Sequence, residues 1–134
     1  MEFREVQQSD IDYMTHNSIN GDLKQLRAID YIYTLEHNGI PLLVGGFRLI
    51  TDTTAWCWVD ISHEAGNHTV TMYRTIKEWI NNFVETHNIK RLQAFTRPDS
   101  EESIRMLKHL GFKPESAMVG FFEDGDALLF VRLI

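Results

Sequence analysis

The sequence predicts an α/β domain built on one mixed sheet of about seven strands, with helices on both faces. Three observations predict this class. Residues 55–62 alternate as a strand does, and residues 69–87 carry an apolar stripe at helical spacing. That helix is long enough to return the chain to a parallel strand. With 134 residues and no linker or repeat, we expect a single domain spanning residues 1–134.

The first thirty residues predict one strand and two short helices. Residues 2–6 alternate as a short strand does. Ser9-Asp10 resembles a helix start, and Ile11 and Met14 face inward from the turns that follow. Asn, Ser and Gly residues at 17–22 end that helix. Residues 23–28 then predict a second short helical turn.

A three-stranded antiparallel meander follows. Strands at residues 31–37 and 40–50 flank Asn38-Gly39, which favours a type I′ turn because both central positions need positive φ. Gly45-Gly46 in the return strand predicts either a bulge or a close approach of another part of the chain. A turn at residues 51–54 leads into the third strand, 55–62.

The strand at 55–62 and the helix after it form the centre of the predicted fold. One face of the strand carries Ala55, Cys57, Val59 and Ile61, and the other carries Trp56, Trp58, Asp60 and Ser62. The lone cysteine therefore reads as a small buried hydrophobe rather than a nucleophile. Residues 63–68 form a polar loop with one glycine. The helix begins near Thr69 and ends at Asn88.

The last third of the chain predicts a strand, a helix and a hairpin. Residues 90–96 form the strand, and Pro98 ends it. Asp99 is the expected N-cap of the helix, with Glu102 completing a capping box. Gly111 ends the helix as a left-handed residue. Residues 119–122 and 127–134 form a hairpin around residues 123–126.

Composition narrows the classes of function. The formal net charge of −6 gives no basic stripe for nucleic acid. No apolar run approaches the roughly 20 residues of a membrane span, and no signal peptide is visible, so we expect a cytoplasmic protein. His63, Glu64 and His68 match no standard ligand spacing, so we expect no metal.

The loop after the strand at 55–62 is the predicted ligand site. Ligands of such sheets bind beyond the carboxyl ends of the strands. A loop that enters a helix also offers unpaired backbone N–H groups and the positive end of the helix dipole. This suits a phosphate or another anion. The alternative is an ordinary strand-to-helix turn.

This order of elements, with Leu110-Gly111-Phe112 closing the second long helix, resembles the GCN5-related N-acetyltransferase (GNAT) family. The family's acyl-CoA loop reads Gln or Arg, two residues, Gly, one residue, then Gly or Ala. Gly66 matches the first glycine, while His63 replaces the Gln or Arg and His68 replaces the last small residue. The family often has a tyrosine four residues before the glycine of Leu-Gly-Phe, as general acid. The matching residue here is Leu107.

The resemblance implies an N-acyltransferase that uses acetyl-CoA as co-substrate and a small-molecule or protein amine as acceptor. The strand backbone, including Val59, Ile61 and Ser62, would pair with the pantetheine arm. The pyrophosphate would lie against the loop, at His63 and at the backbone N–H groups of residues 66–69, which are Gly66, Asn67, His68 and Thr69.

Acyl transfer to an amine also needs a proton acceptor. Asp60 and Glu64, near the end of the strand, are the candidate general bases; the alternative is that both are solvated surface acids. Small members of the fold also occur among phage and prophage proteins. The competing hypothesis is therefore a catalytically inactive protein of this fold that binds a protein partner or acts in virion head assembly, in the host cytoplasm or the virion.

Overall fold

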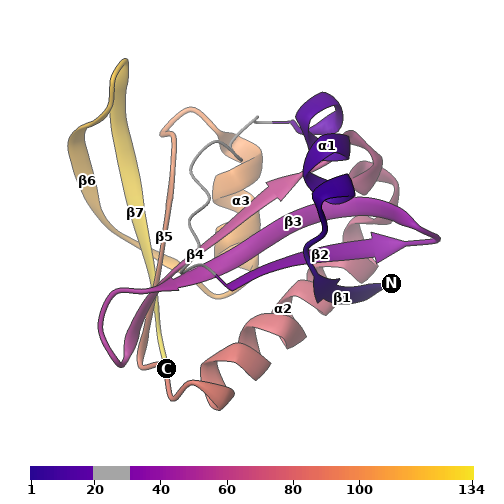
Figure 1. Cartoon of the computed structure of the whole chain (residues 1–134). Helices are drawn as coiled ribbons and strands as arrows, with labels where there is room; N and C mark the ends of the chain where they lie inside the picture. The colour runs from indigo at the N-terminus through magenta and orange to yellow at the C-terminus, as the bar shows by residue number, and fades with distance from the viewer. Residues whose placement is uncertain (20–30) are drawn as a thin grey trace. The chain divides into compact units, whose positions relative to one another are not determined.

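The computed structural model describes residues 1–19 and 31–134, so the helical turn predicted at 23–28 lies outside the described residues. In chain order, the elements are β1 (Glu2–Glu5), α1 (Gln8–Asn17), β2 (Tyr31–His37), β3 (Ile40–Leu49), β4 (Thr54–Ile61), the 3₁₀ helix η2 (His63–His68), α2 (Thr69–Thr86), β5 (Arg91–Thr96), α3 (Glu101–His109), β6 (Lys113–Phe122) and β7 (Gly125–Leu133). The described strands form one seven-stranded sheet in the order β1-β2-β3-β4-β5-β7-β6 (Figure 1). The predicted mixed sheet is confirmed.

Contacts divide the chain into two compact units. The first contains Met1–Arg48 and Cys57–Asn82, and the second contains Leu49–Trp56 and Phe83–Ile134. Strand β4 and helix α2 each contribute residues to both. Each unit is described by itself below, and the expectation of one domain stays a prediction.

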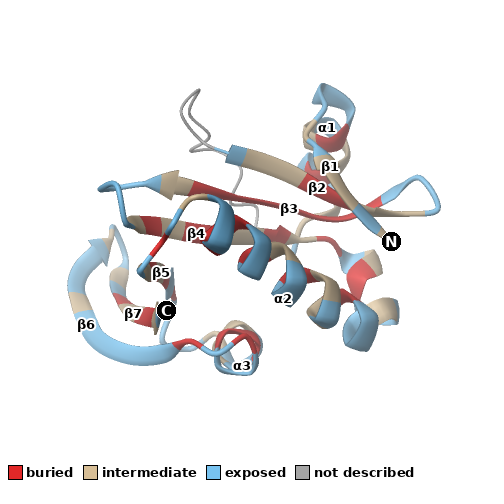
Figure 2. Cartoon of the chain, turned by 90° about the horizontal axis from the view of Figure 1, so that it is seen from below, coloured by how far each residue is buried: buried red, intermediate tan, exposed pale blue. Residues whose placement is uncertain are grey.

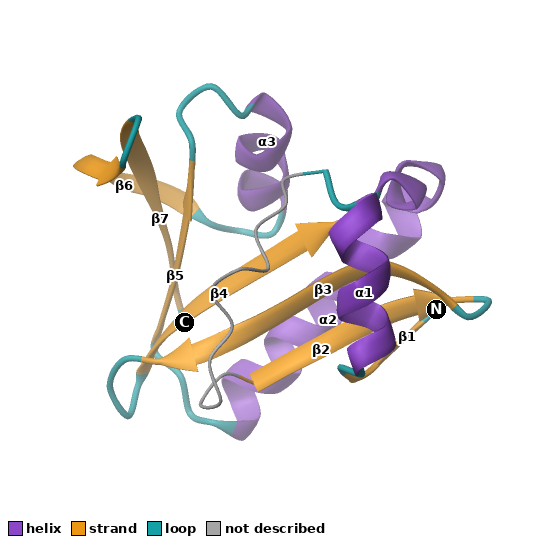
Figure 3. Cartoon of the chain, turned by 45° about the horizontal axis from the view of Figure 1, so that its top comes forward, coloured by secondary structure: helices purple, strands orange, loops and turns teal. Residues whose placement is uncertain are grey.

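In the first unit, β1, β2 and β3 pair antiparallel. Asn38 and Gly39 have φ of 53° and 77°, as a type I′ turn requires. Helices α1 and α2 cover opposite faces of β2 and β3 (Figures 1 and 3). The buried side of α2 faces the sheet and its outer side is exposed (Figure 2). The core of this unit includes Met14, Leu35, Leu42, Leu43, Val44, Phe47, Met72, Ile76 and Ile80.

The two glycines of β3 pair regularly with β2, so the bulge alternative is wrong and the close-approach alternative holds. A Cβ on Gly46 would lie 2.5 Å from the carbonyl oxygen of Tyr31 and 2.9 Å from the ring of Trp58. A Cβ on Gly45 would lie 2.9 Å from the carbonyl oxygen of Trp58. The register shift of this pair lies away from the glycines: the neighbours Leu35 and Glu36 of β2 face Leu43 and Pro41, so Leu42 is the extra residue of β3.

Helix α1 begins at Gln8, before the start that the sequence predicted at Ser9-Asp10. The reason is that Asp10 lies inside the first turn and caps the helix from there. The backbone N–H of Gln7, the true N-cap, donates to the Asp10 carboxylate at 2.8 Å. Arg4 donates to both oxygens of Asp10 at 2.7 and 2.8 Å, and the Thr34 hydroxyl donates at 2.9 Å. Asp10 is 2% exposed, so α1 is fixed to β1 and β2 by a buried ion pair.

In the second unit, β5 pairs parallel with β4 over residues Thr54, Ala55 and Trp56 and antiparallel with β7. Asn88, with φ of 53°, follows α2, and the N–H of Ile89 donates to the carbonyl of Val84. Gly111, with φ of 92°, follows α3 in the same way. The predicted ends of both helices are confirmed.

Two predictions for this unit are wrong. Helix α3 has Ser100 rather than Asp99 as its N-cap, and the Ser100 hydroxyl donates to that of Ser103. Strand β6 begins at Lys113, six residues before the predicted 119, because residues 113–118 lack the alternation that marks a half-buried strand. Almost all of β6 is exposed (Figure 2).

Candidate functional site

The predicted anion-binding loop is a 3₁₀ helix, η2, and not an open loop. The N–H of Ala65 donates to the carbonyl of Ser62 at 3.1 Å, and the Thr69 hydroxyl donates to the carbonyl of Gly66 at 3.3 Å. A 3₁₀ turn uses backbone N–H groups in bonds between residues three apart. The number of N–H groups left for a ligand is therefore smaller than an open loop would offer.

Ser62 fixes the start of η2 to the beginning of β3. Its N–H donates to the carbonyl of Leu42 at 2.9 Å, and its hydroxyl donates to the carbonyl of Pro41 at 3.0 Å. The residue is fully buried. Both of its polar groups therefore serve the fold, and the loop enters α2 from a rigid point.

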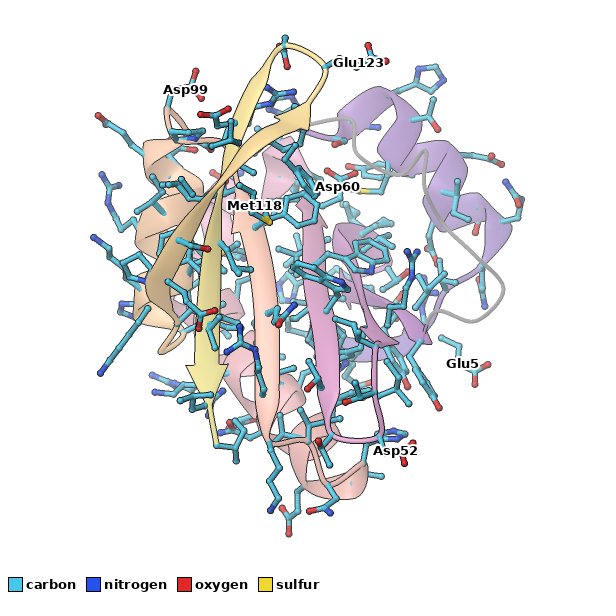
Figure 4. The ribbon with its side chains drawn as sticks, turned by 90° about the vertical axis from the view of Figure 1, so that its left-hand side faces the viewer. Glu5, Asp52, Asp60, Asp99, Met118 and Glu123 are labelled. Atoms are coloured by element: carbon cyan, nitrogen blue, oxygen red, sulfur yellow. The ribbon has the colours of Figure 1, made fainter. Side chains whose placement is uncertain are left out.

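Asp60 is fully buried at the end of β4 (Figure 4). The hydroxyl of Ser18, from the residue after α1, donates to its Oδ1 at 2.5 Å. The surface-acid alternative for Asp60 is therefore wrong. Alternation along the strand could not show this burial, because Ser18 covers Asp60 from 42 residues away in the sequence.

The segment after α1 also pairs with the backbone of β4. Ser18 forms an antiparallel bridge with Ser62, and the N–H of Ile19 donates to the carbonyl of Ile61 at 2.8 Å. Consequently, the carbonyl of Ile61 already has a partner within the chain. Val59 and Ile61 themselves are half-buried.

Gly66 faces open space. Apart from its own neighbours in the chain, no atom of the described residues lies within 4 Å of the position that a Cβ would occupy. Gly66 is exposed, together with His63, Asn67 and Thr69. The fold alone therefore gives no steric reason for a glycine here. The free space permits a ligand to come close to the backbone, which is the property required of a phosphate-binding glycine.

Two histidines meet at the end of η2, and no pattern in the sequence predicted this contact. The rings of His37, at the end of β2, and His68, at the end of η2, lie with centroids 4.6 Å apart. The Nε2 of His68 lies 3.9 Å from a carboxylate oxygen of Glu64, whose side chain is 42% exposed. The Nδ1 of His37 is buried and has no hydrogen-bond partner among residues 1–19 and 31–134. The turn at Asn38-Gly39 joins the end of β2 to the start of β3, and Ser62 bonds to the start of β3. The turn therefore places the end of β2, with His37, near the end of β4.

Leu107 and Trp79 both pack against other parts of the chain. Leu107, at the position of the family's tyrosine, is buried in the second unit. Trp79 packs in the first unit against Phe3, Tyr33 and Phe47. A shallow hollow of about 300 Å³ lies between β1 and α2, and none of the described candidate site residues lines it.

Residues 1–19 and 31–134 lack two kinds of feature, a metal-binding cluster and a membrane-spanning helix. Those residues contain no group of three or more His, Cys, Asp or Glu side chains placed to hold a metal ion. They also contain no helix whose length and apolar character would let it cross a bilayer.

Comparison with known proteins gives likenesses in structure alone: no family model and no curated protein matches the sequence. The chain is similar to ribosomal-protein-S18-alanine N-acetyltransferase from Escherichia coli, with a TM-score of 0.76 and 14% identity over 99% of this chain and 93% of that one. A mutant of spermidine N-acetyltransferase from Vibrio cholerae gives a TM-score of 0.82 and 10% identity over 99% and 95%. Ard1 from Thermoplasma volcanium gives 0.76 and 16% over 99% and 97%.

At these identities the likeness shows the fold. The chain has the GNAT acyl-CoA N-acyltransferase fold over nearly its whole length, as the order of its elements predicted. The solved structures named above give no support to a phage origin or to a part in virion head assembly.

Proposed function

We propose that the protein is an N-acyltransferase that moves an acyl group from acetyl-CoA to an amine. The observation that supports this most is the surroundings of Gly66, an exposed glycine of η2 whose Cβ position is open. It lies on the element that leads into α2, in a fold shared over 99% of the chain with N-acetyltransferases. An open glycine at this place suits a pyrophosphate group.

Binding would use a small set of residues in the first unit. The backbone around Gly66, Asn67 and Thr69 is exposed and would face the phosphates. His68 adds an imidazole at the same place, and its partner His37 supplies a second one. Along β4, the backbone of Val59 and Ile61 would pair with the pantetheine arm. Because Ile19 already bonds the carbonyl of Ile61, we place that pairing at Val59.

The reaction replaces the thioester C–S bond with an amide C–N bond. The attacking amine must be unprotonated and must lose one further proton, which a base accepts, and the departing sulfur gains a proton. Glu64 is the exposed carboxylate of the site and is the proposed base, acting directly or through a water molecule. Asp60 is buried under Ser18, so we assign it the positioning of the end of β4. Leu107 cannot protonate sulfur, so solvent is the proposed proton source.

A thiol-release assay with acetyl-CoA and a panel of primary amines, including polyamines and peptides with free N-termini, tests the activity. Glu64→Gln should lower kcat by at least about tenfold, since general bases typically contribute 10²–10⁴. Its thermal unfolding should match the wild type, because the Glu64 side chain is 42% exposed and its ion-pair distance to His68 is a long 3.9 Å. Lys77→Gln, on an exposed position of α2, is the matched control. Turnover unchanged in Glu64→Gln would exclude Glu64 as the base.

A binding role without catalysis is the second candidate, and two observations favour it. Leu107 stands where the family often has its acid, and Ile19 uses part of the β4 backbone. If this candidate is correct, no amine will release thiol above the rate without enzyme. Binding of acetyl-CoA without turnover would then separate a retained ligand site from a lost activity.

A further inference from the structure

The contact between His37 and His68 joins the end of β2 to the end of η2 within the first unit. We call these two residues the histidine pair. Their ring centroids lie 4.6 Å apart, and their planes are tilted by 57°. Two protonated rings at that separation would repel each other, so the pair favours a state with at most one positive charge.

The two rings of the pair have different surroundings, and these decide which ring carries the charge. The Nδ1 of His37 is buried and has no hydrogen-bond partner among residues 1–19 and 31–134. A proton on this atom would be a buried N–H without an acceptor, which is costly. The side chain of His68 is 28% exposed, and its Nε2 lies 3.9 Å from a carboxylate oxygen of Glu64. The charge of the pair therefore belongs on His68, and His37 stays neutral.

The elements around the pair carry few other charged or titratable groups. On η2, the end of β2, the end of β4 and the first two turns of α2, they are His63, Glu36, Asp60, Tyr73 and Arg74. Arg4 holds Glu36 at 2.9 Å, and the hydroxyl of Ser18 donates to Asp60. His63 and Arg74 are exposed, a phenol carries no charge at neutral pH, and residues 40–44 of β3 are uncharged. Glu64 is therefore the acid that acts on His68 in the protein without ligand.

His68 also belongs to the segment that would bind the pyrophosphate. It is the second residue after the open Gly66 and the last residue before α2, so it lies within the run of backbone N–H groups at residues 66–69. A phosphate bound to those groups would bring its negative charge close to the imidazole. The pyrophosphate and the carboxylate of Glu64 would then compete for the same ring.

We propose that His68 takes up a proton from the solvent as the pyrophosphate binds, and exchanges Glu64 for the phosphate as its partner. This inference rests on the proposed function and adds its regulation by pH. Because binding takes up a proton, the affinity for acetyl-CoA rises as the pH falls. Neutral His37 keeps the uptake to one proton at most. The exchange also leaves the carboxylate of Glu64 free to accept a proton from the amine.

Calorimetric titration with acetyl-CoA at pH 7, in two buffers of different ionisation enthalpy, counts the protons taken up. Wild-type protein should take up roughly half a proton more per ligand than His68→Gln, because an ordinary imidazole is mostly neutral at pH 7. The difference between the two proteins cancels any proton that the phosphate monoester of the ligand exchanges. His16→Gln, at an exposed histidine of α1, is the matched control and should behave as the wild type does.

The affinity itself provides a second readout of the same coupling. Between pH 8 and pH 6, the affinity of the wild type should rise at least about threefold more than that of His68→Gln. Glu64→Gln should take up more protons on binding than the wild type, because its ligand-free His68 lacks the acid that favours the charged ring. An uptake equal to or below that of the wild type would contradict the exchange of partners.

NMR spectra of the imidazole rings test the inference without relying on ligand binding by a variant. On addition of acetyl-CoA at pH 7, the ring signals of His68 should move to the positions of a protonated imidazole, and those of His37 should stay at neutral positions. A neutral His68 in the bound protein, or equal proton uptake by wild type and His68→Gln, would overturn the inference and leave the proposed function standing. Wild-type protein that binds no acetyl-CoA would contradict both.

Discussion

The glycine pair of β3 and the lone glycine of η2 stand in opposite surroundings. At Gly46 an added Cβ would lie 2.5 Å from the carbonyl oxygen of Tyr31, and at Gly45 it would lie 2.9 Å from that of Trp58. At Gly66 an added Cβ would meet nothing within 4 Å. Close contacts within the chain require the pair, whereas the open space at Gly66 leaves room for the proposed pyrophosphate. Gly125, at the β6–β7 hairpin, is equally open, so the space allows a ligand at Gly66 without requiring one.

The largest effect is expected at the buried pair. Gly46→Ala should lower the free energy of unfolding by about 3 kcal/mol, because the new methyl group collides with backbone and with a packed ring. Gly66→Ala is the control and should stay within about 0.5 kcal/mol of the wild type. Urea denaturation measures both. A loss below about 1 kcal/mol in Gly46→Ala would show that β3 can shift, and the contrast between the two glycines would fail.

The same contrast extends to two acids, buried Asp10 and solvated Glu64. Asp10→Asn should cost about 2 kcal/mol, because Arg4 loses its bidentate partner while keeping Glu36. Glu64→Gln should cost less than about 0.5 kcal/mol. Equal losses for the two variants in urea denaturation would contradict the assignment of Asp10 to the fold and Glu64 to the site.

Asp10 also predicts how stability depends on pH. Burial by itself raises the pKa of Asp10, but hydrogen bonds from Arg4, the Gln7 N–H and Thr34, with the charge of Arg4, outweigh it and leave the pKa below its ordinary value. The unfolded chain then binds this proton at higher pH than the folded chain does. The stabilisation is full above about pH 4 and is lost as pH falls through the folded pKa. Thermal unfolding from pH 6 to pH 2.5 should therefore decline less steeply in Asp10→Asn, and an unchanged decline would count against the ion pair.

Local patterns in the sequence predicted the features that local physics decides. The turn at Asn38-Gly39 and the helix end at Gly111 follow from positive φ, and the buried stripe of α2 follows from spacing. The burial of Asp60 did not follow, because it depends on Ser18, far away in the sequence. The contact of His37 with His68 depends on the hairpin in the same way.

Two further differences between the predicted and the observed structure have local causes that the residue pattern did not reveal. Residues 113–118 are exposed on both faces of an edge strand, so they show no alternation to detect. The polar composition of residues 63–68 favoured a loop, yet a short 3₁₀ helix accepts the same residues. The sequence therefore placed residues 63–68 between a strand and a helix, while their hydrogen bonding and the contact of His68 with His37 followed only from the fold.

The most direct measurement of the central claim is calorimetric titration of the wild type and Gly66→Glu with acetyl-CoA, with CoA as a second ligand. The added carboxylate would project into the open space at Gly66 and repel a pyrophosphate, while the absence of neighbours there leaves the fold intact. We predict micromolar binding to the wild type, no detectable binding to Gly66→Glu, and equal unfolding temperatures. Wild-type protein that binds neither ligand at high micromolar concentration, or equal binding by both proteins, would contradict the account.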